Sequence, residues 1–455
     1  MRRRNILLMI ADDLGMTAGC YGDASARTPN IDRLAAQGTR FTHAFTSTAS
    51  CSGSRSVIQT GLHTHQSGQY GLHHGRHHFQ TFADVATAPN LLAAAGHATG
   101  IVGKVHLGPD STYPWASRQE SDSRDVAWVA ARAEAFIAGA GARPFFLTVG
   151  FIDPHRDASR AGFGDPAGPD PIFAPEAVTV PPWLADLPEV RHELAAYHHA
   201  VARMDRGVGL VLDALDRQGA ADETLVVFLS DNGAPFVHSK TTLFDAGVHL
   251  PLILRVPGQG AGVANPNLVS FVDLLPTFLD WAGVEPPQDG RRREGRSLLP
   301  VLHDRARRSG WDRVFGSHTF HEITNYWPTR FLRDTRYKYH RNVAWQLPFP
   351  VSTDIYGSLS FAAIRRAGAG ARPLERLVRR PAEELFDLAA DPLELHNLAG
   401  HAGYGAVLAE MRAALEQWQR RTRDPWLLRD GVSVLAAQDH VAAGLKLPGA
   451  WDFTP

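Results

Sequence analysis

Apolar runs recur along the first two thirds of the chain and alternate with segments of helical periodicity. Five runs rich in Val, Ile, Leu and Phe have the length of buried strands, at residues 6–10, 100–103, 145–151, 225–229 and 250–256. Helical patterns occupy residues 30–37, 88–95, 128–138, 191–218 and 273–281. Buried strands that alternate with helices predict an α/β fold with a large, mostly parallel sheet sandwiched by helices.

The pattern changes after about residue 299. It then predicts short antiparallel strands and a terminal helix, at residues 314–316, 330–333, 337–341 and 404–421. Gly and Pro concentrate in 161–182 and 258–266, which predicts loops. Because 455 residues are many for a single core, we expect an α/β domain over residues 1–310 and a smaller α+β domain with an antiparallel sheet over 311–455.

Polar groups directly follow four of the predicted strands. They are Asp12-Asp13, Lys104-Val105-His106, Asp153-Pro154-His155 and Asp231-Asn232. Ligands of parallel sheets gather at the carboxyl ends of the strands. We therefore expect these groups to form a single site.

An all-oxygen set stands out among these residues. Asp12, Asp13, Asp231 and Asn232 offer the ligands that Ca²⁺ or Mg²⁺ prefers, whereas zinc usually recruits His or Cys. Each pair alone is also typical of a helix cap or a solvated turn. Their occurrence at separate strand ends favours a site for a hard divalent cation.

The segment Cys51-Ser52-Gly53-Ser54-Arg55 lies where an extended stretch should turn into a helix. A helix N-terminus beside a guanidinium can hold an anion, and thiolate chemistry is one use of a cysteine placed there. Cations and proton donors that could join it are Arg55, Lys104, His106, His155 and Lys240. A single His after a strand is more often a hydrogen-bonded loop residue, and Lys240 is ambiguous on spacing alone.

A second group of histidines, His73, His74, His77 and His78, invites a transition-metal interpretation. No Cys or carboxylate lies close in sequence, so we favour a structural or pocket-lining loop. Cys20 is most simply a small apolar residue near the first loop.

Composition excludes several classes of protein. A formal net charge of −1 argues against a nucleic-acid binder, and two cysteines exclude a disulfide framework. Residues 1–11 resemble a signal peptide in their charged and apolar parts, but the apolar run is short and continues into Asp12-Asp13, so we interpret it as the first strand. No apolar run has the length of a membrane span. We expect a cytoplasmic protein that binds neither membrane nor nucleic acid.

Serial motifs along almost the whole chain resemble those of the type I sulfatases, which have an alkaline phosphatase-like fold. The motifs are Ala11-Asp12-Asp13, Thr28-Pro29-Asn30-Ile31-Asp32, the Cys51 segment, Gly103-Lys104-Val105-His106-Leu107-Gly108, Ser230-Asp231-Asn232-Gly233 and Glu384-Leu385-Phe386-Asp387-Leu388. Others are similar to the heparan N-sulfatase (sulfamidase) branch, namely Tyr70-Gly71-Leu72-His73, Asp153-Pro154-His155-Arg156, His321-Glu322, Pro348-Phe349-Pro350 and Asp424-Pro425-Trp426. The chain departs from the pattern at Gly53, where the family usually has Pro or Ala.

The resemblance implies a role for each candidate residue. Cys51 would be the precursor of formylglycine, whose hydrate is the nucleophile, and Arg55 would support it. Calcium, or alternatively magnesium, would be held by Asp12, Asp13, Asp231 and Asn232. Lys104 and Lys240 would grip the sulfuryl oxygens, His155 would lie near the leaving group and His106 would act as a base. His321 and Glu322 would meet the sugar, and the smaller domain would contribute to the substrate pocket.

The resemblance also implies a function: hydrolysis of the N-sulfate (sulfamate) of glucosamine residues in heparan- or heparin-type saccharides. A formylglycine-generating enzyme would mature the protein, and relatives suggest a homodimer. Three alternatives stay open: an O-sulfatase or phosphonate monoester hydrolase on the same core, a sulfated-sugar-binding protein whose Cys51 is never converted, and a plain cysteine hydrolase.

Overall fold

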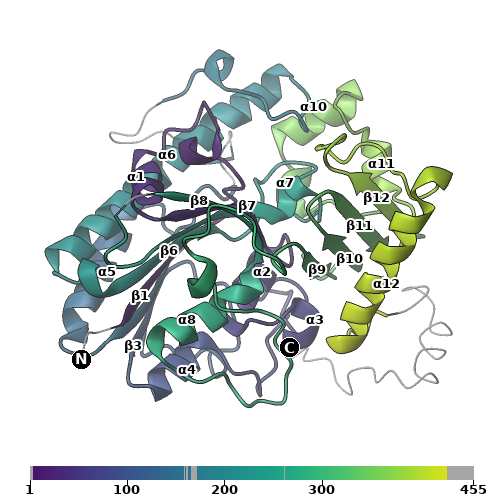
Figure 1. The fold of residues 1–455 in the computed structure, drawn as a ribbon. Helices are drawn as coiled ribbons and strands as arrows, with labels where there is room; N and C mark the ends of the chain where they lie inside the picture. Colours follow the sequence, from purple (N-terminus) through teal and green to yellow (C-terminus); the bar gives the residue numbers. More distant parts are fainter. Residues whose placement is uncertain (1–3, 158, 160–161, 165–171, 261, 428–455) are drawn as a thin grey trace.

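Two sheets lying side by side organise the chain (Figure 1). The computed structural model describes residues 4–427 apart from 158, 160–161, 165–171 and 261. Within this part, the large sheet has eight strands in the order β4-β3-β5-β1-β6-β7-β2-β8, and β7 runs antiparallel to both of its neighbours. Its strands are β1 (Asn5–Ala11), β2 (Thr39–Phe45), β3 (Ala98–Gly103), β4 (Ser117–Glu120), β5 (Phe145–Gly150), β6 (Thr224–Ser230), β7 (His249–Arg255) and β8 (Val263–Ser270).

The second sheet is antiparallel, with the order β12-β11-β10-β9. Its strands are β9 (Val314–His318), β10 (Thr329–Arg333), β11 (Tyr337–Asn342) and β12 (Glu383–Asp387). Helix α12 covers one of its faces (Figure 1), where Trp418 packs against Leu332 and Tyr339.

Helices cover both faces of the large sheet. The α-helices are α1 (Pro29–Gln37), α2 (Cys51–Thr60), α3 (Thr64–Ser67), α4 (Ala88–Ala94), α5 (Val126–Ala140), α6 (Pro188–Arg217), α7 (Asp245–Val248), α8 (Leu274–Ala282), α9 (Thr353–Tyr356), α10 (Leu359–Ala367), α11 (Leu374–Val378) and α12 (Gly405–Arg421). Short 3-10 helices occupy Gly19–Tyr21, Pro175–Ala177, Ala221–Glu223, Phe271–Asp273, Leu299–Val301 and Ala402–Tyr404.

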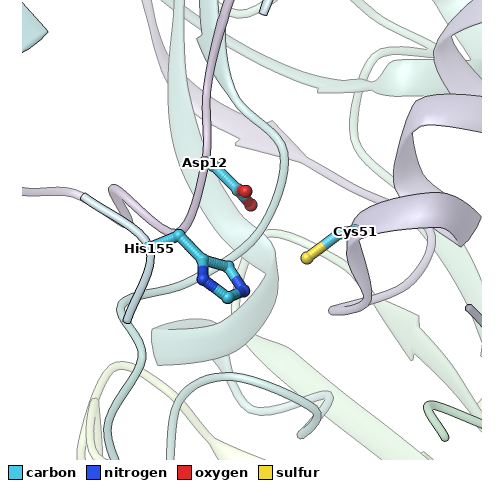
Figure 2. Close-up of side chains that lie close together, drawn as sticks. All are labelled: Asp12, Cys51 and His155. Atoms are coloured by element: carbon cyan, nitrogen blue, oxygen red, sulfur yellow. The ribbon is translucent and has the colours of Figure 1, made fainter. Parts of the chain in front are cut away.

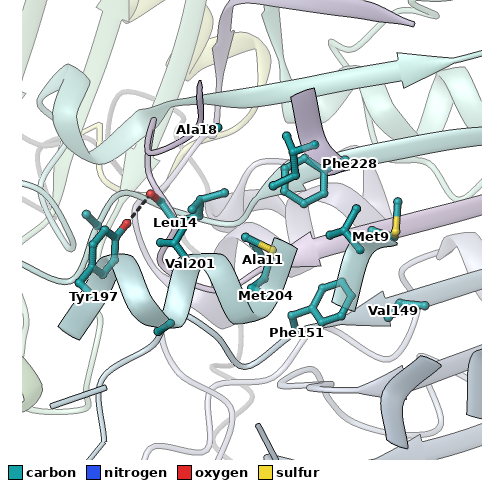
Figure 3. Packing of buried hydrophobic residues seen from close by; sticks show 14 of the residues in the cluster. Met9, Ala11, Leu14, Ala18, Val149, Phe151, Tyr197, Val201, Met204 and Phe228 are labelled. Atoms are coloured by element: carbon teal, nitrogen blue, oxygen red, sulfur yellow. Dashed lines mark hydrogen bonds between the residues drawn. The ribbon is translucent and has the colours of Figure 1, made fainter. Parts of the chain in front are cut away.

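Strand β1 lies at the centre of the core, and its side chains pack into the hydrophobic clusters on both faces of the sheet. Leu7 and Met9 join the cluster that contains Met204 of α6, whereas Ile6 and Leu8 join the cluster on the opposite face, with residues of α2 and α8. Successive side chains of a strand point to opposite faces, so the continuous apolar run from Ile6 to Ala11 in β1 is what a sheet covered on both sides requires. Figure 3 shows the α6 side of this packing.

The predicted fold class is confirmed, and several element predictions need correction. All five predicted strands and all five predicted helices of the α/β part are present, with ends shifted by up to three residues. Strands β2, β4, β8 and β12 were not predicted, and the expected loop 258–266 is wrong from residue 263, where β8 begins. Residues 161, 165–171 and 428–455, which fall in the expected loop 161–182 and in the smaller domain, lie outside the described part.

The domain boundary at residue 310 stays a prediction. All strands of the large sheet end by Ser270 and all strands of the small sheet begin at Val314 or later. A cluster that includes Phe45, Leu268 and Phe331 joins the two sheets. Among the described residues, no helix combines the length and the apolar character needed to cross a membrane.

Candidate active site

Strands β3, β5, β1 and β6 are neighbours that run parallel, so their carboxyl ends meet at one edge of the sheet. Hydrogen bonds continue past the strands: Lys104 N donates to Gly150 O at 2.8 Å, and Asp231 N donates to Ala11 O at 3.0 Å. A Cβ on Gly150 would lie 2.2 Å from Lys104 O, so glycine is required for this approach. The structure thus brings all four predicted polar groups to one edge.

The oxygen set is fully buried at this edge. Asp12, Asp13 and Asp231 each place an oxygen within 4.8 Å of the other two, and Asn232 Nδ2 donates to Asp13 Oδ1 at 2.6 Å. Asp12 Oδ1 and Asn232 Oδ1 have no hydrogen-bond partner among the described residues. Buried oxygens are rarely left unpaired, and a hard divalent cation binds such oxygens. The residues present therefore fit a divalent cation.

The surroundings shift the pKa values of two of these carboxylates in opposite directions. Burial, together with the negative charge of Asp12, raises the pKa of Asp231 to about 7. Burial would also raise the pKa of Asp12, but Lys104, His155 and Arg55 outweigh it and hold that pKa well below its usual range. A cation among these oxygens would relieve the repulsion between like charges.

Cys51 is the first residue of helix α2, and Figure 2 shows its side chain pointing toward Asp12 and His155. Its thiol lies 3.8 Å from Asp13 Oδ1, and its sulfur groups with Asp12 and His155 within 4.8 Å. The residue is 1% exposed. Burial, followed by the charge of Asp12, raises the pKa of the thiol well above its ordinary value. A protonated thiol is a poor nucleophile, which argues against the cysteine-hydrolase alternative.

Two buried cations hold carboxylates of the set. Arg55 Nε donates to Asp231 Oδ2 at 2.9 Å, and Lys104 Nζ contacts Asp12 Oδ2. Burial would lower the pKa of Lys104, but Asp12 outweighs it and raises that pKa. Both side chains are therefore charged at neutral pH.

Lys240 is the third buried cation. Its Nζ donates to Asp13 Oδ2 at 2.8 Å and to Asp354 Oδ2 at 2.7 Å, and it lies 3.3 Å from His155 Nε2. His155 Nδ1 donates to Arg156 O at 2.6 Å, which leaves Nε2 as the atom that faces the site. Burial, followed by Lys240, lowers the pKa of His155, so its ring is neutral at neutral pH.

His106 lies next to the histidine-rich loop. Its Nε2 contacts His74 Nδ1, and the two rings stack with centroids 4.3 Å apart. Burial, followed by Lys104, lowers the pKa of His106 well below its usual range, so the ring is neutral. Among the described residues, no grouping of potential metal ligands includes His73, His74, His77 or His78.

The remaining predicted residues border the site. His321 Nδ1 pairs with Ser50 Oγ at 2.9 Å, directly before Cys51. Glu322 accepts hydrogen bonds from Thr353 N at 3.3 Å and Thr353 Oγ1 at 2.9 Å. The sequence did not predict Asp354, which is the residue after Thr353. Its only signal was the nearby Pro348-Phe349-Pro350 motif.

Comparisons with known proteins agree with this geometry. The sulfatase family model matches residues 4–284, and the model "N-sulphoglucosamine sulphohydrolase, C-terminal" matches residues 236–347. The chain is 37% identical to N-sulphoglucosamine sulphohydrolase of Homo sapiens over 95% of its own length and 93% of that relative.

Solved structures share the fold. A protein in complex with its substrate D-glucosamine-2-N,6-O-disulfate has a TM-score of 0.69 at 21% identity, covering 93% of this chain and 99% of its own. The phosphonate monoester hydrolase of Agrobacterium radiobacter has a TM-score of 0.70 at 22% identity, covering 93% of this chain and 97% of its own. With a family model that matches more than half of its length, the chain belongs to the sulfatase family.

Proposed function

We propose that this sulfatase hydrolyses the N-sulfate of glucosamine residues in heparan- or heparin-type saccharides. The observation that carries this choice is the similarity to the human N-sulphoglucosamine sulphohydrolase over nearly the whole of both chains. It includes the C-terminal region, where a separate family model matches residues 236–347. The overall reaction is R–NH–SO₃⁻ + H₂O → R–NH₃⁺ + SO₄²⁻.

Two groups that the family uses would complete the site. Cys51 would be converted to formylglycine, whose hydrate supplies an oxygen nucleophile and a second hydroxyl that lets the aldehyde re-form. Asp12, Asp13, Asp231 and Asn232 would hold Ca²⁺, or alternatively Mg²⁺, which supplies Lewis-acid stabilisation of negative charge.

The residues of the chain would bind and orient the sulfamate. Lys104 and Lys240 would hold the sulfuryl oxygens, since both ammonium groups are buried and fixed beside carboxylates before any ligand arrives. Arg55, anchored on Asp231 at 2.9 Å, would keep the residue at position 51 in place. Charge fixed in advance stabilises a transition state without reorganisation.

Two neutral histidines would move the protons. His155 can take up a proton at Nε2 and give it to the leaving nitrogen, because Nδ1–H is committed to the Arg156 carbonyl. His106, neutral at neutral pH, can accept a proton in the second half of the reaction. An adjoining cavity of about 620 Å³, bordered by Glu322 and Thr353, offers room for the rest of the saccharide.

The test compares three substrates after expression with a formylglycine-generating enzyme. We expect the mass of the Cys51 peptide to show conversion, and N-sulfoglucosamine to be hydrolysed faster than an aryl sulfate or phenyl phosphonate. The Cys51→Ala variant is the control for background hydrolysis. A converted protein that cleaves aryl sulfate but no sulfamate would identify an O-sulfatase, and an unmodified thiol with saccharide binding would identify a binding protein.

We also propose a homodimer, as the family resemblance suggests. Light scattering across a range of protein concentrations tests this proposal. A mass of one chain at every concentration would remove it.

A further inference from the structure

Asp354 reaches the site from the C-terminal part of the chain. Helix α9 places its carboxylate so that Oδ2 accepts from Lys240 Nζ at 2.7 Å. One oxygen of Asp354 also groups with Asp13 and His155 within 4.8 Å. Asp354 is thus a fourth carboxylate of the site, next to the histidine that the proposed function puts beside the leaving group.

Exposure separates Asp354 from the other three carboxylates. The side chains of Asp12, Asp13 and Asp231 are 0% exposed, whereas Asp354 is 20% and His155 is 25% exposed. The open side of the site is therefore bordered by Asp354 and His155. A sulfamate whose sulfur lies beside residue 51 must keep its nitrogen and its sugar on this open side.

The orientation of Asp354 is fixed before a ligand arrives. Its Oδ1 accepts from Ser352 Oγ at 2.6 Å and from Ile355 N at 2.9 Å. Burial would raise the pKa of Asp354, but Lys240 and His321 outweigh it and hold that pKa below its usual range, so the group is ionised. Lys240 Nζ also donates to Asp13 Oδ2 at 2.8 Å, so the ammonium group lies between the two carboxylates.

We propose that Asp354 selects an amine over an alcohol as leaving group, by contacting the leaving nitrogen and pairing with the ammonium of the product. This inference rests on the proposed function. In the overall reaction the S–N bond breaks, the oxygen of water is bonded to sulfur in the sulfate, and the two protons of water go to the nitrogen. The nitrogen thereby becomes R–NH₃⁺, which a carboxylate stabilises strongly. The alcohol released from an O-sulfate stays neutral and gains much less from the same carboxylate.

The first experiment measures binding without turnover. Calorimetry with unconverted protein compares glucosamine, below the pKa of its amine, with N-acetylglucosamine. We expect the wild-type protein to bind glucosamine about ten-fold or more tightly than the neutral sugar, since hydrogen bonds to charged groups are the stronger ones. Equal binding of the two sugars by the wild-type protein overturns the inference, and this arm needs no variant.

The second experiment uses the Asp354→Asn variant, which keeps size and removes charge. We expect it to lose the preference for glucosamine, and kcat/KM for N-sulfoglucosamine to fall about 100-fold with less than a ten-fold fall for aryl sulfate. Equal losses for both substrates would mean that Asp354 only positions Lys240. The matched control is Asp213→Asn, the same substitution at a half-exposed carboxylate that pairs with Arg33.

The two hypotheses fail differently. Converted wild-type protein without sulfamate turnover would contradict the proposed function, whatever the binding data show. Sulfamate turnover that the Asp354→Asn variant retains in full would contradict the role of Asp354 alone.

Discussion

At the scale of single residues, both cysteines are held as thiols by their surroundings. Burial raises the pKa of Cys20 to about 12, with Asp32 as a further cause, and raises that of Cys51 well above its usual range. Because the thiolate is the reactive form, we expect unconverted protein at neutral pH to react with iodoacetamide far more slowly at both positions than a free cysteine does.

Peptide mass spectrometry after timed labelling checks this expectation. Unfolded protein is the control, since both thiols should then label at the rate of model peptides. Rapid labelling of Cys51 in the folded protein would restore the cysteine-hydrolase alternative.

The sequence predicted residues of the site that directly follow an apolar run. Asp12, Lys104 and Asp231 could be placed together because parallel strands bring their carboxyl ends to one edge. Asp354 follows no strand and lies in a short helix far along the chain. Its approach to Lys240 depends on how the C-terminal part packs, which no local pattern encodes.

At the scale of elements, the strands of the large sheet that the sequence predicted are those whose composition is continuously apolar. Strand β2, Thr-Arg-Phe-Thr-His-Ala-Phe, mixes polar and apolar residues, and β8 contains Pro266 and two asparagines. Strand β4, Ser-Arg-Gln-Glu, lies at the edge of the sheet, where its polar side chains stay partly exposed. These strands form through pairing with neighbours rather than through local preference.

Helix α2 explains the glycine at position 53. A Cβ there would lie 2.8 Å from Thr48 Cγ2 and 3.2 Å from Thr64 Cγ2. We expect Gly53→Ala to lower the free energy of unfolding by about 1–3 kcal/mol, as overpacking of a core does. The gain in helix propensity of about 1 kcal/mol offsets only part of this loss.

Combining Gly53→Ala with Thr48→Ser removes the clashing methyl group and keeps the hydroxyl that pairs with His318 Nδ1 at 2.9 Å. Urea unfolding of the two single variants and the double variant measures the coupling. If Gly53→Ala lowers the free energy of unfolding as much in the Thr48→Ser background as in the wild type, the proposed clash is contradicted.

A buried ion pair anchors the segment that follows helix α12. Arg330 of β10 holds Asp424 through two hydrogen bonds of 2.7 and 2.9 Å, and both side chains are 0% exposed. Burial would raise the pKa of Asp424, but Arg330 outweighs it and lowers that pKa below its ordinary 3.8. A lowered folded-state pKa contributes stability above pH 3.8, which is lost as the pH falls below it.

We expect Asp424→Asn to cost about 3–5 kcal/mol at neutral pH, because Arg330 is left buried without a counter-charge. The difference from wild type should shrink as the pH falls below about 4. Denaturant unfolding across pH measures both effects. Glu416→Gln, which breaks an exposed pair with Arg420, is the control and should cost less than about 1 kcal/mol.

At the scale of the whole molecule, a cation at Asp12, Asp13 and Asp231 would connect β1 with β6 in the middle of the large sheet. Binding at about 100 times the dissociation constant stabilises a folded protein by about 2.7 kcal/mol. We therefore expect a chelator to lower the melting temperature by a few degrees and added Ca²⁺ to restore it.

Scanning calorimetry with Ca²⁺ and with Mg²⁺ identifies the preferred ion. The Asp12→Asn variant should lose most of the response, and the exposed Asp122→Asn variant should keep it. A melting temperature that changes with neither the chelator nor the added cations would contradict the proposed cation site.

Cys51 is 1% exposed, at the start of a helix in which every residue is buried. A second protein could not bind the segment around Cys51 once the chain has folded, because the segment is then buried. Conversion of Cys51 would then have to take place during synthesis or in an unfolded chain, before folding buries the residue. Protein that folds with the thiol intact should therefore stay inactive until it is denatured and refolded in the presence of the converting enzyme.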